Sequence, residues 1–373
     1  MVTWPRLPGT APSQSMDHRA RQRRLEAALA ASGADAFLVT HLANVRYLCG
    51  FTGSSGIIAL AGGQRVLFTD GRYSAQARQE ARALRVVIAR GALLEEAAAW
   101  LGRRRARRIA VEAQHMTLAA RGVLVRMLPA KARLKPLAGL VERQRMIKEP
   151  GEVALIRSAV LLGSSLFHRA LKVLRPGVTE AEVAGEIEHA ARRAGAQGMS
   201  FETIVAGGRR SALPHGIASS QPVPNKGFVV LDFGVILGGY CSDMTRTVHM
   251  GRASSQSREM YQVVREAQEM AIAAVRPGAK AGEVDYAARR VLRKAGLGKY
   301  FTHSTGHGLG LEIHEPPRLG KDQTEVLEPG MVVTIEPGVY VAGRGGVRIE
   351  DVVVVTPGGC EVLTPTTKEL IEL

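Results

Sequence analysis

The carboxyl-terminal part of the chain carries four carboxylates and one histidine whose setting predicts a metal site. Asp232 and Asp243 stand in LDFGVILGGYCSDMTRT, His307 in STGHGLGLEIHE, Glu336 in TIEPG and Glu350 in VRIED. Carboxylates on apolar strands are costly to bury unless a cation neutralises them. Two divalent ions balance four carboxylates, and oxygen ligands with one imidazole suit ions such as Mn²⁺. These residues therefore predict a two-metal hydrolase.

The acidic residues lie in pairs on two predicted hairpins. Asp232 and Asp243 are equidistant from the peptide bond that follows Leu237, so an unbulged antiparallel pair would place them directly opposite each other. Glu336 and Glu350 lie symmetrically about a glycine inside the AGRGG loop. Like charges in such positions repel unless a cation lies between them, which strengthens the prediction of a metal site.

This part of the chain also contains an internal repeat with a spacing of 101 residues. The stretch 174–183 (LRPGVTEAEV) resembles 275–284 (VRPGAKAGEV), and 192–195 resembles 293–296 in the same register. In both copies Pro-Gly ends one predicted helix and a second helix follows. Each copy precedes one acidic hairpin. We therefore predict a duplicated α+β unit with a pseudo-two-fold axis, in which the two hairpins bring the four carboxylates together.

The amino-terminal part alternates helix-like and strand-like stretches, which is typical of an α/β domain. We expect a long helix to begin near Glu152, and the stretch 137–150 to separate two domains, 1–143 and 144–373. Strands are predicted at 35–40, 56–62, 64–70, 85–90 and 108–113, and helices at 17–33, 72–84 and 93–104.

Composition narrows the choice of partners and compartment. Residues 1–150 hold 25 Lys and Arg against 10 Asp and Glu, but the Arg-rich run 103–108 comes with no recognition motif, so nucleic acid is not expected as a partner. The longest apolar runs have strand length, so no membrane span is expected. Three widely spaced cysteines predict no disulfide framework. A start without an apolar signal segment then favours the cytoplasm.

Taken together, these motifs resemble the metallopeptidases of the "pita-bread" fold, family M24. Within that family the resemblance is to the Xaa-Pro branch, aminopeptidase P and prolidase (Xaa-Pro dipeptidase). Residues 144–373 resemble the catalytic domain. NVRY at 44–47, FTG at 51–53 and FTDGRY at 68–73 resemble the creatinase-like amino-terminal domain of the proline-specific members. All five ligand positions of the family are filled.

The resemblance implies a role for each ligand. Asp232 would bind one metal ion and His307 the other, while Asp243 and Glu350 would bridge the two. Glu336 would be a terminal ligand that also carries a proton to the leaving nitrogen. A hydroxide that bridges the metals would attack the peptide carbonyl. The two ions are expected to be Mn²⁺, with Co²⁺ and Zn²⁺ as alternatives.

Five further residues match positions outside the ligand set. His215, His303 and His314 match the family's substrate-side histidines and would orient the carbonyl and stabilise the oxyanion. Arg348, two residues before a ligand, would hold carboxylates in ligand geometry, although an ordinary strand ion pair is the alternative. Arg318 would clamp the carboxyl terminus of a dipeptide, and a surface arginine is the alternative.

The implied reaction is hydrolysis of Xaa-Pro bonds at the amino terminus of short peptides, by a dipeptidase or an aminopeptidase. A homodimer is expected by analogy. A metal-free creatinase-like hydrolase and a non-catalytic pita-bread binding protein are both disfavoured by the complete ligand set. A methionine-aminopeptidase-like enzyme is disfavoured by the additional amino-terminal domain.

Overall fold

The computed structural model describes residues 16–373, which form two compact units that meet in sequence between Arg145 and Met146. The divide lies two residues after the boundary that we predicted. Each unit has its own sheets and its own buried apolar core.

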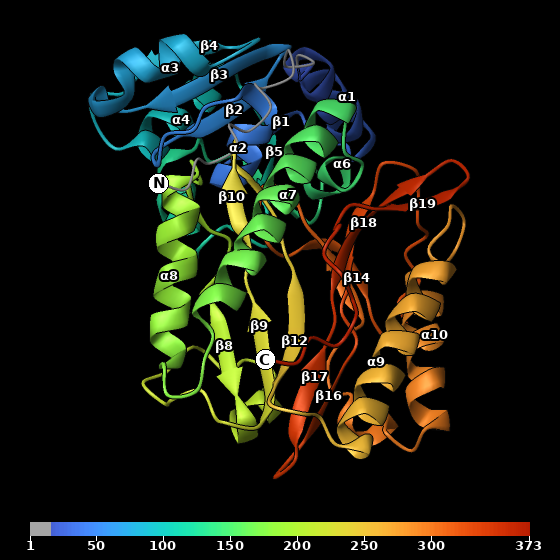
Figure 1. Ribbon diagram of the computed structural model, residues 1–373. Coiled ribbons are helices and arrows are strands. Elements are labelled where there is room, and N and C mark those ends of the chain that lie inside the picture. The colour runs from blue at the N-terminus through green and yellow to red at the C-terminus, as the bar shows by residue number, and fades with distance from the viewer. Residues whose placement is uncertain (1–15) are drawn as a thin grey trace. The chain divides into compact units, whose positions relative to one another are not determined.

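The amino-terminal unit is built on one mixed six-stranded sheet in the order β4-β3-β2-β1-β5-β6 (Figure 1). Strand β1 pairs antiparallel with β2 and parallel with β5, and all four residues of β1 are buried. The strands are β1 (Ala36–Val39), β2 (Ile57–Ala61), β3 (Gln64–Thr69), β4 (Arg85–Ile88), β5 (Arg108–Glu112) and β6 (Arg133–Leu137). The helices are α1 (His18–Ala31), α2 (Leu42–Cys49), α3 (Ser74–Glu80), α4 (Leu93–Arg103), α5 (Leu118–Met127) and α6 (Glu142–Met146).

This sheet confirms the predicted α/β character, since all five predicted strands are present. Helix α4 buries Ala97, Ala98, Trp100 and Leu101, and the Trp100 ring contacts Phe68 on β3 edge-to-face. The predicted helix 72–84 is shorter than expected and ends at Glu80.

The carboxyl-terminal unit confirms the predicted duplication. Its helices are α7 (Pro150–Val173), α8 (Glu180–Arg193), α9 (Ser255–Ala274) and α10 (Ala281–Lys294). Helix α9 ends 101 residues after α7 ends, and α10 begins 101 residues after α8 begins. Backbone contacts repeat as well. Gly177 N–H donates to the Val223 carbonyl at 3.0 Å, and Gly278 N–H donates to the Leu327 carbonyl at 2.9 Å. The two halves therefore share one local design.

Each helix pair covers its own antiparallel sheet, as Figure 1 shows for α8 with β8 and β9 and for α9 and α10 with the second sheet. The first half has the orders β12-β9-β8 and β11-β10-β7, and the second half β14-β13-β15-β18-β19 and β16-β17. The first-half strands are β7 (Gly198–Met199), β8 (Ile204–Gly207), β9 (Gly227–Asp232), β10 (Val235–Leu237), β11 (Tyr240–Cys241) and β12 (Thr245–Met250). The second-half strands are β13 (Gly306–Gly308), β14 (Glu315–Leu319), β15 (Val332–Ile335), β16 (Gly338–Val341), β17 (Gly345–Arg348), β18 (Asp351–Thr356) and β19 (Gly359–Val362).

The register of the first acidic hairpin differs from our prediction. Asp232 pairs with Thr245, not with Asp243. The reason is the turn, because Gly238 and Gly239 both have positive φ (57° and 84°) and together form a tight two-residue connection. The hairpin is therefore centred one residue further along the chain. The resulting two-residue offset in the pairing leaves both aspartates on the same face of the hairpin, since side chains alternate with a period of two.

The register of the second hairpin is as predicted. Ile335 pairs with Asp351 and Gly338 pairs with Arg348. The same register places Glu336 opposite Glu350 in the short gap between these paired segments. Like-charged side chains thus lie opposite each other, as the prediction of a metal site requires.

Helix α7 corrects one expectation from the sequence. It has the length and apolar composition of a membrane span, which we did not expect of any segment. However, 56% of its most apolar window is buried inside the protein. Leu166 and Phe167 are among its fully buried residues, a pattern that is typical of a core helix.

Gly234 gives a test of the first hairpin. A Cβ atom added there would lie 1.8 Å from the Ser242 carbonyl oxygen. The backbone around this contact must therefore move in Gly234→Ala. We expect it to lower the free energy of unfolding by about 2 kcal/mol or more. Gly185→Ala is the matched control, because it lies inside α8 with no atom within 4 Å of the new Cβ and should stabilise by about 0.5–1 kcal/mol. Urea denaturation of both variants measures these changes, and equal effects would contradict the proposed close approach.

Candidate metal centre

The predicted ligands line one cavity of about 810 Å³ in the carboxyl-terminal unit. Both halves contribute to it. Asp232 ends β9, Asp243 lies two residues before the start of β12, and His307 lies in β13, while Glu336 and Glu350 flank the β16–β17 hairpin. The five residues that we selected from the sequence are therefore brought together.

Distances within the cluster suit metal ligation. Ligand atoms of Asp243, His307 and Glu350 all lie within 4.8 Å of one another. His307 Nε2 lies 3.6 Å from a carboxylate oxygen of Asp243 and 3.6 Å from one of Glu336. The other ring nitrogen, Nδ1, lies 3.0 Å from the Gly308 carbonyl, which can only accept a hydrogen bond. This contact puts the proton on Nδ1, so the Nε2 lone pair points toward the carboxylates.

Three carboxylate oxygens in the cluster provide a direct test of whether a cation fits. Asp232 Oδ1, Asp243 Oδ1 and Glu350 Oε1 are buried, and none has a hydrogen-bond partner within residues 16–373. Buried polar atoms are nearly always paired with protein or water. Three such oxygens beside an imidazole lone pair form a donor set that suits divalent cations, so these residues fit a metal centre.

The pKa values of the cluster agree with this conclusion. Burial, with the neighbouring carboxylates, raises the pKa of Asp243 and of Glu350 well above the usual range. Burial also raises the pKa of Glu336 to about 8. Burial lowers the pKa of His307 to about 4, so its imidazole is neutral and able to bind metal. Without a cation, the raised pKa values of Asp243, Glu336 and Glu350 favour protonated carboxyl groups, and a bound cation would replace those protons.

Polar side chains behind the cluster fix the orientation of the carboxylates. The Arg348 guanidinium is buried and donates to the second oxygen of Asp232, and its Nε donates to Thr245 Oγ1 at 3.0 Å. The Thr245 hydroxyl in turn donates to Glu350 Oε2 at 2.7 Å. Arg348 thus occupies the position that the sequence suggested, in contact with a carboxylate of the opposite half.

Tyr340 is a site residue that the sequence analysis missed. Its hydroxyl accepts a hydrogen bond from Arg348 at 2.7 Å and lies 2.9 Å from His303 Nε2. His303 Nδ1 lies 2.8 Å from the Ser304 carbonyl and so carries the ring proton. Tyr340 must therefore donate to Nε2. The only sequence signal was its position four residues after Glu336, in EPGVY.

This arrangement changes what His303 can do. Both of its ring nitrogens bond within the protein, and burial lowers the pKa of His303 to about 3. A neutral ring with a hydrogen bond at each nitrogen is suited to holding Tyr340 and, through it, Arg348. In this conformation His303 lines the cavity without a ring nitrogen free for the substrate carbonyl that we predicted as its partner.

The other predicted substrate residues lie at the exposed side of the same cavity. His215 and His314 are exposed, and the His314 ring lies 4.5 Å from the His307 ring, centroid to centroid. Arg318 is also exposed and donates from Nε to the Ser304 hydroxyl at 2.6 Å. All three are among the residues that line the cavity.

A second missed residue, Asp285 in α10, holds the loop that leads to His307. It is buried and accepts from the Thr305 hydroxyl at 2.8 Å and from the Thr305 amide at 3.2 Å. The Thr305 carbonyl accepts from the Glu336 amide at 2.7 Å. Helix α10 thereby fixes the spacing between two ligand segments.

Comparison with protein families explains this arrangement. The model of metallopeptidase family M24 matches residues 154–357, and the model of the Creatinase/Prolidase N-terminal domain matches residues 21–147. The chain belongs to metallopeptidase family M24. The fold class predicted from the sequence, a creatinase-like domain followed by a duplicated pita-bread domain, is thereby confirmed.

Individual relatives agree with this assignment. The chain is 41% identical over 341 residues to the peptidase YqhT of Bacillus subtilis (strain 168), which is 91% of this chain and 96% of that one. It is 42% identical over 237 residues to the Xaa-Pro dipeptidase of Pyrococcus furiosus, covering 64% of this chain and 68% of that one. Metallopeptidases are thus its relatives along most of its length.

Solved structures give the same result. The Xaa-Pro dipeptidase from Bacillus anthracis has a TM-score of 0.93 and 40% identity, over 96% of this chain and 100% of that one. The X-Pro aminopeptidase from Thermotoga maritima has a TM-score of 0.86 and 35% identity, over 94% of this chain and 100% of that one. Structures named as a dipeptidase and as an aminopeptidase are thus both similar to this chain along nearly its whole length.

The raised pKa of Glu336 predicts how the stability of the metal-free protein depends on pH. Between pH 4.5 and about 8 the folded state holds a proton that the unfolded state has lost, so this group makes folding less favourable as pH rises. Glu336→Gln removes the effect. Relative to the wild type, the metal-free variant should gain at least about 1 kcal/mol of unfolding free energy between pH 5 and pH 8. Urea denaturation in chelator measures the difference, and a pH-independent difference would contradict the assignment.

Tyr340→Phe tests the hydrogen-bonded chain from His303 to Arg348. The variant keeps the ring but leaves a buried donor of Arg348 and the His303 Nε2 acceptor without a partner. We expect catalytic efficiency to fall about 10- to 100-fold, the range for residues that support ligands. Metal content should equal that of the wild type. Loss of both ions, or unchanged activity, would show that the hydroxyl does not have this role.

Proposed function

We propose that this protein is a dinuclear-metal exopeptidase that hydrolyses Xaa-Pro bonds at the amino terminus of short peptides. The observation that carries the proposal is the cluster of four carboxylates and one neutral imidazole, with three buried oxygens that no described residue pairs. Relatives named Xaa-Pro dipeptidase and X-Pro aminopeptidase support the choice of substrate class. An X-Pro nitrogen carries no N–H, so this substrate requires a dedicated site.

The donor set suggests how two ions would be held. Asp232 and His307 lie on opposite halves and would each bind a different ion, and Asp243 and Glu350 would contribute to both. Bound divalent ions would supply a Lewis acid and lower the pKa of a bound water toward neutrality. Once a bound cation has replaced the proton that burial favours on Glu336, this carboxylate would accept a proton during attack and return it to the leaving nitrogen.

The exposed side of the cavity offers groups for the substrate. Partial desolvation lowers the pKa of His314, so a neutral ring is available to orient a carbonyl. His215 lies on the same side of the cavity. Arg318 presents a guanidinium for the carboxylate of a short peptide, which favours dipeptides over longer substrates.

Three further properties are part of the proposal. Mn²⁺ is proposed as the native ion because the set is dominated by carboxylate oxygens, with Co²⁺ and Zn²⁺ as alternatives. A homodimer and a cytoplasmic location are carried over from the sequence analysis. Metal analysis of the purified protein and its sedimentation in solution test the first two.

The first experiment compares hydrolysis of Ala-Pro and Ala-Pro-Ala in Mn²⁺, with a chelated sample as control. Metal-dependent cleavage of Ala-Pro alone would identify a dipeptidase, and cleavage of Ala-Pro-Ala an aminopeptidase. Met-Ala-Ser tests the methionine-aminopeptidase alternative. A protein that binds two ions but cleaves none of the three would contradict the proposed activity and favour a binding protein of the same fold.

Arg318→Ala tests the carboxylate clamp. Removal of the guanidinium should raise KM for Ala-Pro about 10-fold or more, because a charge-assisted bidentate contact is lost. KM for Ala-Pro-Ala should change by much less. Arg344→Ala, in the loop of the second hairpin and outside the cavity lining, is the control. Equal losses on both substrates would rule out a dipeptide clamp.

A further inference from the structure

A second arginine, Arg246, lies directly behind the metal centre on the opposite face of strand β12. The side chain of its neighbour Thr245 points toward the carboxylate cluster and donates to Glu350. Because side chains alternate along a strand, Arg246 points the other way, into the protein interior. Its side chain is 2% exposed. None of the roles given to the five ligands uses a charge at this position, so its contacts need an explanation.

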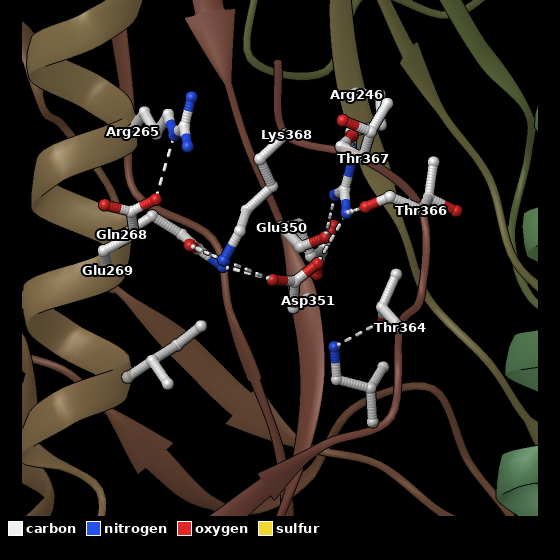
Figure 2. Close-up of polar contacts among 12 residues, drawn as sticks. Arg246, Arg265, Gln268, Glu269, Glu350, Asp351, Thr364, Thr366, Thr367 and Lys368 are labelled. Atoms are coloured by element: carbon white, nitrogen blue, oxygen red, sulfur yellow. Dashed lines mark hydrogen bonds and ion pairs between the residues drawn. The ribbon is translucent and has the colours of Figure 1, made fainter.

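All five N–H donors of Arg246 have acceptors. Nη1 donates to the backbone carbonyls of Thr245, at 2.9 Å, and Glu350. Nη2 donates to Asp351 Oδ1 at 2.7 Å and to the Thr366 carbonyl at 2.7 Å, and Nε donates to the Thr367 carbonyl at 2.8 Å. Figure 2 shows Arg246 between Asp351 and the tail residues. A guanidinium offers five donors in a rigid plane, and here the plane fixes the relative positions of five acceptors.

These contacts join three separate parts of the chain. Thr245 belongs to the first half and Glu350 to the second, and the Glu350 amide itself donates to the Thr245 carbonyl at 3.1 Å. Thr366 and Thr367 belong to the carboxyl-terminal tail that follows β19. The side chain of Arg246 therefore fixes the backbone at two site residues, one of them a predicted bridging ligand, from behind.

The partner of Arg246 is itself held in place. Asp351 is buried, and its second oxygen accepts from Gln268 Nε2 at 2.8 Å and lies 3.2 Å from Lys368 Nζ. Lys368 also donates to Gln268 Oε1 at 3.0 Å, as Figure 2 shows. The tail thus contributes both backbone carbonyls and a cation to the network, and α9 contributes the glutamine.

We propose that Arg246 is a positioning residue for the metal centre, which sets the position of Glu350 by linking both halves to the tail segment 364–368. The inference rests on the proposed function only in requiring that Glu350 binds metal. A carboxylate that bridges two ions must keep its position to within a fraction of an ångström. The fork geometry of Arg246, and not its charge alone, supplies this constraint.

Arg246→Lys is the principal test, because it keeps the buried positive charge but cannot reproduce a planar five-donor contact. Mn²⁺ is titrated into the metal-free protein by calorimetry, and the visible spectrum of the Co²⁺-loaded protein reports ligand geometry. We expect Mn²⁺ affinity to fall about 10-fold or more, because mutation of residues that support metal ligands typically has an effect of this size. The Co²⁺ spectrum should also change. Asp351→Asn, which keeps shape but removes charge, should change both in the same direction. Affinity within 2-fold of the wild type in Arg246→Lys would overturn the proposal.

Two controls separate positioning from general stability. Arg265→Ala removes contacts of α9 with Glu269 and with Glu369 of the tail but touches none of the five acceptors. Leu166→Ala lowers stability from the core of the first half, where Leu166 is fully buried. Both variants should keep Mn²⁺ affinity within 2-fold of wild type. An equal loss of affinity in Leu166→Ala would overturn the proposal, since any destabilisation would then suffice.

Activity on Ala-Pro, measured in the same wild-type sample, distinguishes the two proposals. Tight Mn²⁺ binding without cleavage contradicts the proposed function, while the affinities of the variants still decide the role of Arg246. A wild-type protein that binds none of Mn²⁺, Co²⁺ and Zn²⁺ contradicts both.

Discussion

Mutual repulsion of buried carboxylates is the constraint on which the structure of the carboxyl-terminal unit depends. Asp232, Asp243, Glu336 and Glu350 lie around one cavity, and the pKa values of three of them are raised by burial and by one another. Such a cluster is stable only when protons or cations offset the charge. Among the described residues, the buried Arg348 guanidinium lies against this cluster and pairs with Asp232. The remaining carboxylates form a site whose charge divalent ions, as proposed, would balance.

The duplicated architecture answers this constraint with geometry. In each half, acidic residues lie at the end of a strand or beside a hairpin. The cavity forms where the two halves meet. The polar contacts that orient the ligands cross between the halves, as with Arg348 and Asp232 or Thr245 and Glu350. A ligand on one half is thus held by the other half, so the geometry of the site and the packing of the halves are not independent.

Much of this could be predicted from the sequence, because types and spacing of residues carry the information. The repeat of 101 residues and the symmetric position of Glu336 and Glu350 follow from counting, and both agree with the structure. The register of the first hairpin could not be obtained by centring the acids, since the Gly238–Gly239 turn sets it instead. The roles of Tyr340, Asp285 and Arg246 depend on contacts between residues far apart in the chain, which no local pattern encodes. The dual engagement of His303 was missed for the same reason, as its partner Tyr340 is 37 residues away.

The order of the ligands along the chain has a consequence for how the protein is made. Asp232 and Asp243 precede the helix pair α9–α10, whereas Glu350 and the arginine that pairs with Asp232 come more than 100 residues later. A growing chain folds from its amino terminus, so the first half must acquire its structure while its two aspartates have neither their arginine nor their opposing carboxylates. The proposed ligand set is complete only after Glu350 has been made and the second half has folded, so binding of metal by all five ligands would follow the folding of both halves and could not direct the folding of the first.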